Sequence, residues 1–161
     1  MTGGRTRRLR WGALAALVLV PAVRSNGPKR GGHGAREALH ELSLAQAIWR
    51  QVAAEMNKRE AGTQLVGVNL VVGALSGTDP ESLEFAMRLV VEGSGWPDAE
   101  VRIRAEPAAL RCRDCGRDYE AEGWDWACPA CGRTDFEVLA GRDLRLESLE
   151  VQETNDATHS A

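Results

Sequence analysis

Four cysteines are the residues whose types and spacing point most directly to chemistry. Two residues separate Cys112 from Cys115 and Cys128 from Cys131, and twelve residues lie between the two pairs. Two such loops can turn four thiolates toward one point, and four sulfur ligands at this spacing are typical of a tetrahedral zinc ion. The alternatives are a disulfide pair and a redox-active Cys-x-x-Cys motif.

A zinc ion with four thiolate ligands has no open position for a substrate, so the predicted site is structural and not catalytic. Gly116 and Gly132 directly follow the second cysteine of each pair. Glycine permits the left-handed backbone that such loops often need. We expect the zinc ion to fold an insert, residues 109–140, that has too little core of its own.

The region around the cysteines is acidic, which disfavours a nucleic-acid-binding zinc ribbon. Residues 110–138 contain four arginines and seven acidic residues. Aromatic side chains there could stack on bases, but without a basic groove they suit a small core or a protein interface. These aromatic residues are Tyr119, Trp124, Trp126 and Phe136. A protein-interaction adaptor and a nucleic-acid-binding ribbon remain the alternative functions.

Histidine is scarce, and only His40 lies directly before a segment with a helical pattern. No Ser/His/Asp or Cys/His arrangement can be assembled from the sequence, so we predict that the chain is not an enzyme. An isolated histidine near a helix start is commonly solvated, so the residue alone does not identify a metal ligand.

Two helices are predicted to position these residues. Ser43 and Gln46 form a capping box, and apolar residues at three- and four-residue steps predict an amphipathic helix over residues 44–61, capped by Gly62. Asp79, followed by proline, is a start signal for a second helix, which runs to Gly93.

Three strands are predicted at residues 64–72, 100–104 and 144–151, where apolar residues alternate with others. The predicted fold is α+β: a small three-stranded sheet with two helices on one side and an inserted zinc-ribbon domain between the last two strands. Residues 39–108, completed by a strand at 142–151, would form the main domain. The polar tail, residues 152–161, is expected to be frayed.

The first 38 residues differ in composition from the rest of the chain. They carry eight Lys or Arg residues and one acid, whereas residues 39–161 carry twelve and twenty-two. The basic start, the apolar run at 11–20 and residues 20–22 resemble an export signal, and the run is too short for a membrane span. Residues 24–38 are expected to be disordered. The acidic remainder would repel nucleic acid and anionic membranes.

Four segments in order resemble the HypA/HybF family of hydrogenase nickel-incorporation proteins. They are residues 40–46, residues 71–73 with 76–83 and Phe85, the cysteine pairs and residues 144–151. The resemblance covers residues 39–151 and implies a cytoplasmic nickel metallochaperone with a structural zinc ion. It also implies a GTPase partner of the HypB type and delivery of Ni(II) to the large subunit of [NiFe]-hydrogenase or, in some organisms, to urease.

The resemblance also implies a nickel site at the start of the matched region. Family members begin Met-His-Glu, which maps onto His40 and Glu41, and the histidine binds nickel together with nitrogen atoms of the chain terminus. Ni(II) favours square-planar sites rich in nitrogen, so this chemistry is reasonable. Glu41 and Asp79 are additional candidate ligands. Asp79 stands where some relatives carry an acidic residue near nickel, and it is equally well placed as a helix cap.

Leu39 stands where the family has its initiator methionine. Bacterial genes can start at codons that specify leucine internally, so we expect the functional chain to begin at residue 39 and the preceding residues to be upstream sequence. A genuine export signal is the less favoured interpretation. It would separate the chain from cytoplasmic partners and expose the cysteines to oxidation.

Overall fold

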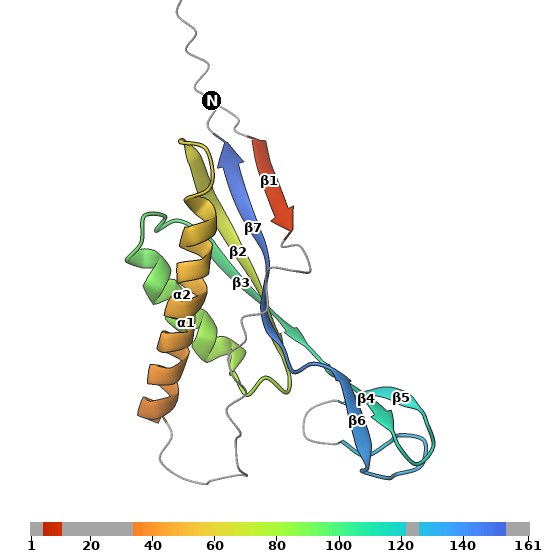
Figure 1. Cartoon of the computed structure of the whole chain (residues 1–161). Helices are drawn as coiled ribbons and strands as arrows, with labels where there is room; N and C mark the ends of the chain where they lie inside the picture. The colour runs from red at the N-terminus through yellow and green to blue at the C-terminus, as the bar shows by residue number, and fades with distance from the viewer. Residues whose placement is uncertain (1–4, 11–33, 122–125, 154–161) are drawn as a thin grey trace, which may run out of the picture.

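The computed structural model describes residues 5–10, 34–121 and 126–153, and these residues form two helices and seven strands (Figure 1). The helices are α1 (Gly34–Met56) and α2 (Pro80–Glu92). The strands are β1 (Arg5–Arg10), β2 (Thr63–Gly73), β3 (Glu100–Glu106), β4 (Ala108–Cys112), β5 (Asp118–Ala121), β6 (Phe136–Ala140) and β7 (Leu144–Glu153). The α+β class is as predicted.

The larger sheet has the strand order β1-β7-β2-β3. Strands β2 and β3 are parallel and joined through α2, while β7 is antiparallel to both of its neighbours. The three predicted strands are β2, β3 and β7. The expected three-stranded sheet is wrong by one strand, because β1 pairs with the outer edge of β7. That edge would otherwise present unpaired backbone N–H and C=O groups.

Helices α1 and α2 pack on the same face of the larger sheet (Figure 1). One buried apolar cluster joins them to β2, β3 and β7, and it includes Ile48 and Val52 from α1 and Leu83 and Met87 from α2. Along β2, the alternate residues Val68, Leu70 and Val72 face this cluster. The two predicted helices therefore pack on the three predicted strands.

Helix α1 begins before its predicted start. It begins at Gly34, so Ser43 and Gln46 lie inside the helix and do not cap it. Residues 35–39 are Ala, Arg, Glu, Ala and Leu, which favour helix, so nothing stops the helix upstream of Ser43. The expected disorder is therefore wrong for residues 34–38.

Helix α1 also ends earlier, at Met56 and not at residue 61. The amides of Asn57, Lys58 and Arg59 bond to carbonyls of the last helical turn. Gly62, which was predicted to cap the helix, has a φ of 93° and lies in the turn that leads into β2. The chain therefore leaves the helix through a separate turn before the strand begins.

Helix α2 has the predicted boundaries. Asp79 Oδ2 accepts a hydrogen bond from the Ser82 amide at 2.8 Å, Pro80 is the first helical residue, and Gly93 follows the last turn.

At the other end of the chain, β7 includes residues 152 and 153, so the expected fraying is wrong for these two. The rest of the tail and the apolar run of the leader lie outside the described residues.

The smaller sheet has the order β5-β4-β6 and lies at one end of the larger sheet (Figure 1). It falls between β3 and β7 in the chain, where the insert was predicted. Gly73 and Gly141 meet where the two sheets join: a Cβ on Gly73 would lie 2.2 Å from the Gly141 oxygen. The Leu75 amide donates to the same oxygen at 2.7 Å. No helix in the described part of the chain is long and apolar enough to span a membrane.

Candidate metal centres

The two Cys-x-x-Cys loops have the same backbone structure. The Gly116 amide donates to the Cys112 carbonyl at 3.0 Å, and the Gly132 amide donates to the Cys128 carbonyl at 2.8 Å. Both glycines have a positive φ, 74° and 69°, as predicted. A side chain at either position would strain the backbone, so glycine allows each loop to turn both of its sulfurs inward.

The four sulfur atoms converge. All lie within 4.8 Å of one another, with Cys112 Sγ and Cys131 Sγ at 3.6 Å and Cys115 Sγ and Cys128 Sγ also at 3.6 Å. A disulfide bond would bring two sulfurs to about 2.05 Å, and the four thiols are free. A tetrahedron with metal–sulfur bonds of about 2.3 Å has edges of about 3.8 Å, so this set fits a zinc ion.

The backbone of the second loop favours a thiolate. Burial raises the pKa of Cys128, but hydrogen bonds from the Ala130 and Cys131 amides outweigh it and lower that pKa to about 7. The Arg133 amide also lowers the pKa of Cys131, yet burial and the neighbouring sulfurs raise it to about 12. Four thiolates this close repel one another, so a cation at their centre is needed to hold all four ionised.

A small apolar cluster supports the site. Its buried members are Ala108, Leu110 and Ala121, and Tyr119 and Phe136 pack against it. Leu75 and Val138 pack against it as well. The Tyr119 hydroxyl donates to the carbonyl of Trp126 at 2.8 Å, and the Trp126 ring lies 5.5 Å from that of Phe136. Tyr119 and Phe136 therefore cover the small core, which is one of the two predicted roles. Trp126 contacts these two residues, and Trp124 lies outside the described residues.

Among the described residues of this region, two of the four arginines are paired with acids. Arg111 donates to both carboxylate oxygens of Asp118, at 2.6 and 2.9 Å, and Arg113 lies 3.8 Å from Asp135. The Arg111 guanidinium lowers the pKa of Asp118 through a hydrogen bond. These ion pairs neutralise arginine charges that could otherwise contact the phosphates of a nucleic acid. Like the acidic composition, they disfavour nucleic-acid binding.

The proposed nickel residues His40 and Glu41 lie inside α1, on different faces. His40 is exposed, whereas the Glu41 side chain is buried and its Oε2 has no hydrogen-bond partner among the described residues. Glu41 precedes the buried Leu44 and Ala45 by three and four residues, so it continues the apolar stripe of the helix. That spacing was a signal in the sequence that this carboxylate would be buried.

Asp79 lies at the start of α2, where it caps the helix. The hydrogen bond from the Ser82 amide lowers its pKa, and the side chain is exposed. Within residues 5–10, 34–121 and 126–153, the four cysteines are the residues brought together as a metal-binding group of three or more. His40, Glu41 and Asp79 do not form such a group in this structure.

The family model that describes "Hydrogenase/urease nickel incorporation, metallochaperone, hypA" matches residues 39–151. The hydrogenase maturation factor HypA of Acidithiobacillus ferrooxidans is 34% identical over 114 residues, which are 71% of this chain and 100% of that protein. The HypA of Aquifex aeolicus is 32% identical over 116 residues, 71% of this chain and 98% of that protein.

A solved structure has a similar fold. The solution structure of a HypA protein superposes with a TM-score of 0.50 and 25% identity, covering 70% of this chain and 95% of that chain. The matches cover 95–100% of each relative's own length and 70–71% of this chain.

Proposed function

Because the chain belongs to the HypA family of hydrogenase and urease nickel-incorporation metallochaperones, we propose that it binds one Ni(II) ion at His40 of α1 and delivers it to the large subunit of a [NiFe]-hydrogenase. A GTPase of the HypB type is the partner in this step, and the reaction takes place in the cytoplasm. The chain binds and transfers a metal ion and catalyses no reaction of its own. The observation that best supports the nickel site is the exposed position of His40 at the beginning of the region that the family model matches.

The second metal is a structural zinc ion held by Cys112, Cys115, Cys128 and Cys131. The close sulfur positions and the thiolate-stabilising amides support this assignment. When bound, zinc supplies the charge that holds four thiolates together and closes the loops around itself. In the proposed division, residues 109–140 form the zinc domain, and residues 39–108 with 142–151 form the nickel domain.

Nickel binding depends on where α1 begins. In the full chain His40 is the seventh residue of the helix, so its amide and that of Glu41 belong to the internal hydrogen-bond ladder. In a chain that begins at residue 39, these amides belong to the first turn, whose N–H groups have no partner within the helix. The amine of residue 39, two free amides and the His40 imidazole can then surround Ni(II) in one plane.

Isothermal titration calorimetry on matched proteins tests this site. The forms are residues 1–161, residues 39–161 with methionine in place of Leu39, and the latter with His40→Ala. We expect one Ni(II) per chain in the second form, weaker binding in the first and none in the third. Since His40 is exposed and distant in sequence from the cysteines, the zinc content should not change. Equal nickel affinity in all three forms would contradict both the ligand and the start at residue 39.

A further inference from the structure

Strand β1 is held on the edge of β7 by contacts on both of its faces. The two strands pair from Arg5 opposite Glu153 to Arg10 opposite Ser148. On one face, Arg8 donates to Glu150 Oε1 through Nη2 at 2.7 Å and Nε at 3.2 Å. On the other face, Leu9 packs against the main apolar cluster. The strand is therefore recognised by its side chains as well as by its backbone.

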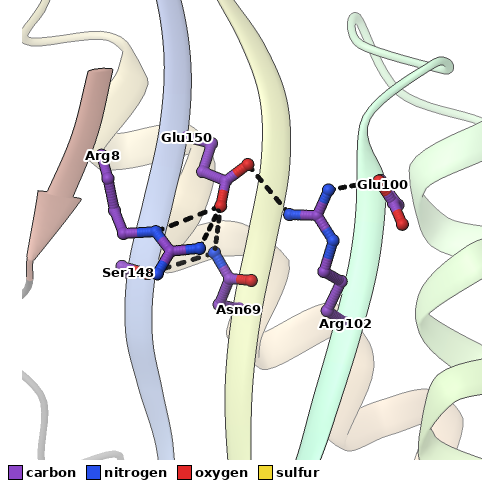
Figure 2. A network of polar contacts seen from close by, with 6 residues as sticks. All are labelled: Arg8, Asn69, Glu100, Arg102, Ser148 and Glu150. Carbon is purple, nitrogen blue, oxygen red and sulfur yellow. Dashed lines mark hydrogen bonds and ion pairs between the residues drawn. The ribbon is translucent and has the colours of Figure 1, made fainter. Parts of the chain in front are cut away.

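The Glu150 carboxylate is held in position by residues outside β1 (Figure 2). Its Oε2 accepts a hydrogen bond from Arg102 at 2.9 Å, and its Oε1 accepts one from the Asn69 amide at 3.3 Å. Asn69 is itself buried and donates to Ser148 Oγ at 3.1 Å. Because these bonds do not involve β1, the acceptor for Arg8 stays in place when the strand is absent. Preorganisation of this kind lowers the entropic cost of docking.

A glycine makes room for this carboxylate. Gly67 of β2 lies opposite Glu150, and a Cβ on Gly67 would lie 3.2 Å from Glu150 Oε2 and 3.3 Å from Arg102 Nη1. A larger residue would crowd the ion pair. Glycine at position 67 of β2 therefore leaves space for the Glu150 carboxylate and its ion pair with Arg102.

The two faces together define the register of the docked strand. Side chains of a strand alternate between faces, so a shift by one residue would place Leu9 beside Glu150 and Arg8 against the apolar cluster. Burying an arginine there without a partner is unfavourable. The edge therefore selects an arginine followed by an apolar residue, and not any extended segment.

We propose that the β7 edge of the larger sheet is a docking site for an arginine-rich extended segment, that Glu150 selects an arginine of this segment, and that β1 occupies the site as a detachable strand of this chain. The mode is strand addition to a sheet edge. Charge complementarity supports this occupant, since residues 1–38 are strongly basic and residues 39–161 are acidic. The inference does not depend on nickel binding, and it concerns the chain of residues 1–161, in which the leader is present.

Residues 39–161 form a suitable protein for the test. Every buried member of the main cluster lies between Leu44 and Val151, and Leu9 only packs against it from outside. The HypA of Acidithiobacillus ferrooxidans matches over its full length and covers 71% of this chain. The fold is therefore complete without the leader, and its removal opens the β7 edge.

Fluorescence anisotropy of a labelled peptide with the sequence of residues 5–10 measures docking directly. A tethered strand has an effective concentration of about 1 mM, so a peptide with a Kd of about 100 μM should bind residues 39–161 about tenfold more tightly than the full chain. Arg8→Glu in the full chain should release β1 and restore peptide binding. Hydrogen exchange of the β1 amides reports this release independently, and it should speed up in the same variant.

Matched variants of residues 39–161 separate recognition by Glu150 from general charge attraction. Glu150→Gln should weaken peptide binding by about tenfold, as expected for loss of a charge-assisted hydrogen bond. Glu147→Gln removes an acid from the same strand whose partner is Arg104 of β3, and it should leave binding unchanged. The proposal is overturned if residues 39–161 do not bind the peptide or if both variants weaken binding equally. It is also overturned if a second copy of residues 39–161 occupies the edge and the peptide cannot displace it.

Discussion

Replacing Glu150 with glutamine should lower the free energy of unfolding of the full chain by about 1–2 kcal/mol at pH 7. The pKa of Glu150 is lowered from 4.5 to about 2, first by the hydrogen bond from Arg102 and then by that from Arg8. At 1.36 kcal/mol per pKa unit, this difference corresponds to about 3 kcal/mol. Solvent screening reduces that value, because the Arg8 and Arg102 side chains are 62% and 43% exposed.

The effect has a defined pH dependence. Because the folded-state pKa of Glu150 is lowered, its stabilising contribution is fully present above pH 4.5 and is lost as the pH falls toward about 2. Urea unfolding of the wild-type chain and of Glu150→Gln between pH 7 and pH 3 measures it. The difference between the two proteins should be constant down to about pH 5 and then shrink, since other titrating carboxylates cancel in the comparison.

Glu147→Gln is the matched control for this prediction. Glu147 and its partner Arg104 are about half exposed, so their ion pair should contribute less than about 0.5 kcal/mol. A difference for Glu150→Gln that is as small as the control, or that stays the same at pH 3 and pH 7, would refute the assigned role of the Glu150 network.

Three further outcomes follow from the fold. Asp79→Ala should lower the free energy of unfolding by about 1 kcal/mol, because the Ser82 amide loses its acceptor, and Asp79→Asn should retain most of it. Gly141→Ala should cost about 2 kcal/mol or more in the same urea assay, because Gly141 has a φ of 96° and a Cβ there would lie 2.7 Å from the Pro107 oxygen. Cys131→Ser, or removal of metal by a chelator, should abolish the slow hydrogen exchange of β4 and β6 and leave that of β2 and β7 unchanged, with metal content measured by elemental analysis.

Sequence patterns predicted the parts of the fold that depend on local signals. Asp79 with its following proline fixed the start of α2, and the alternation in β2, β3 and β7 gave the central strands. The spacing of the cysteines gave their convergence, because two tight loops with glycine at the turn leave the sulfurs few other positions. These features depend on residues close together in the chain.

The errors arose where a local signal competed with its surroundings. The capping box at Ser43 is a valid signal, but the helix-favouring residues before it extend α1 to Gly34. The pairing of β1 with β7 joins residues 138 to 148 positions apart, as in the bond between Arg8 and Glu150. No periodicity within residues 5–10 identifies such a partner, because the partner edge exists only after the sheet has formed.

The leader acts on this fold in two places through different bonds, which allows its two proposed effects to be separated. Its strand occupies the β7 edge through Arg8 and Leu9, whereas its covalent link to residue 39 keeps the His40 amide inside α1. Arg8→Glu in the full chain removes the first effect and leaves the second, so it should open the edge to the peptide without raising nickel affinity. Cleavage between residues 38 and 39 should raise nickel affinity whether or not β1 remains docked. If Arg8→Glu alone raised nickel affinity to that of residues 39–161, strand docking would control the nickel site, and the requirement for a free amine next to His40 would be wrong.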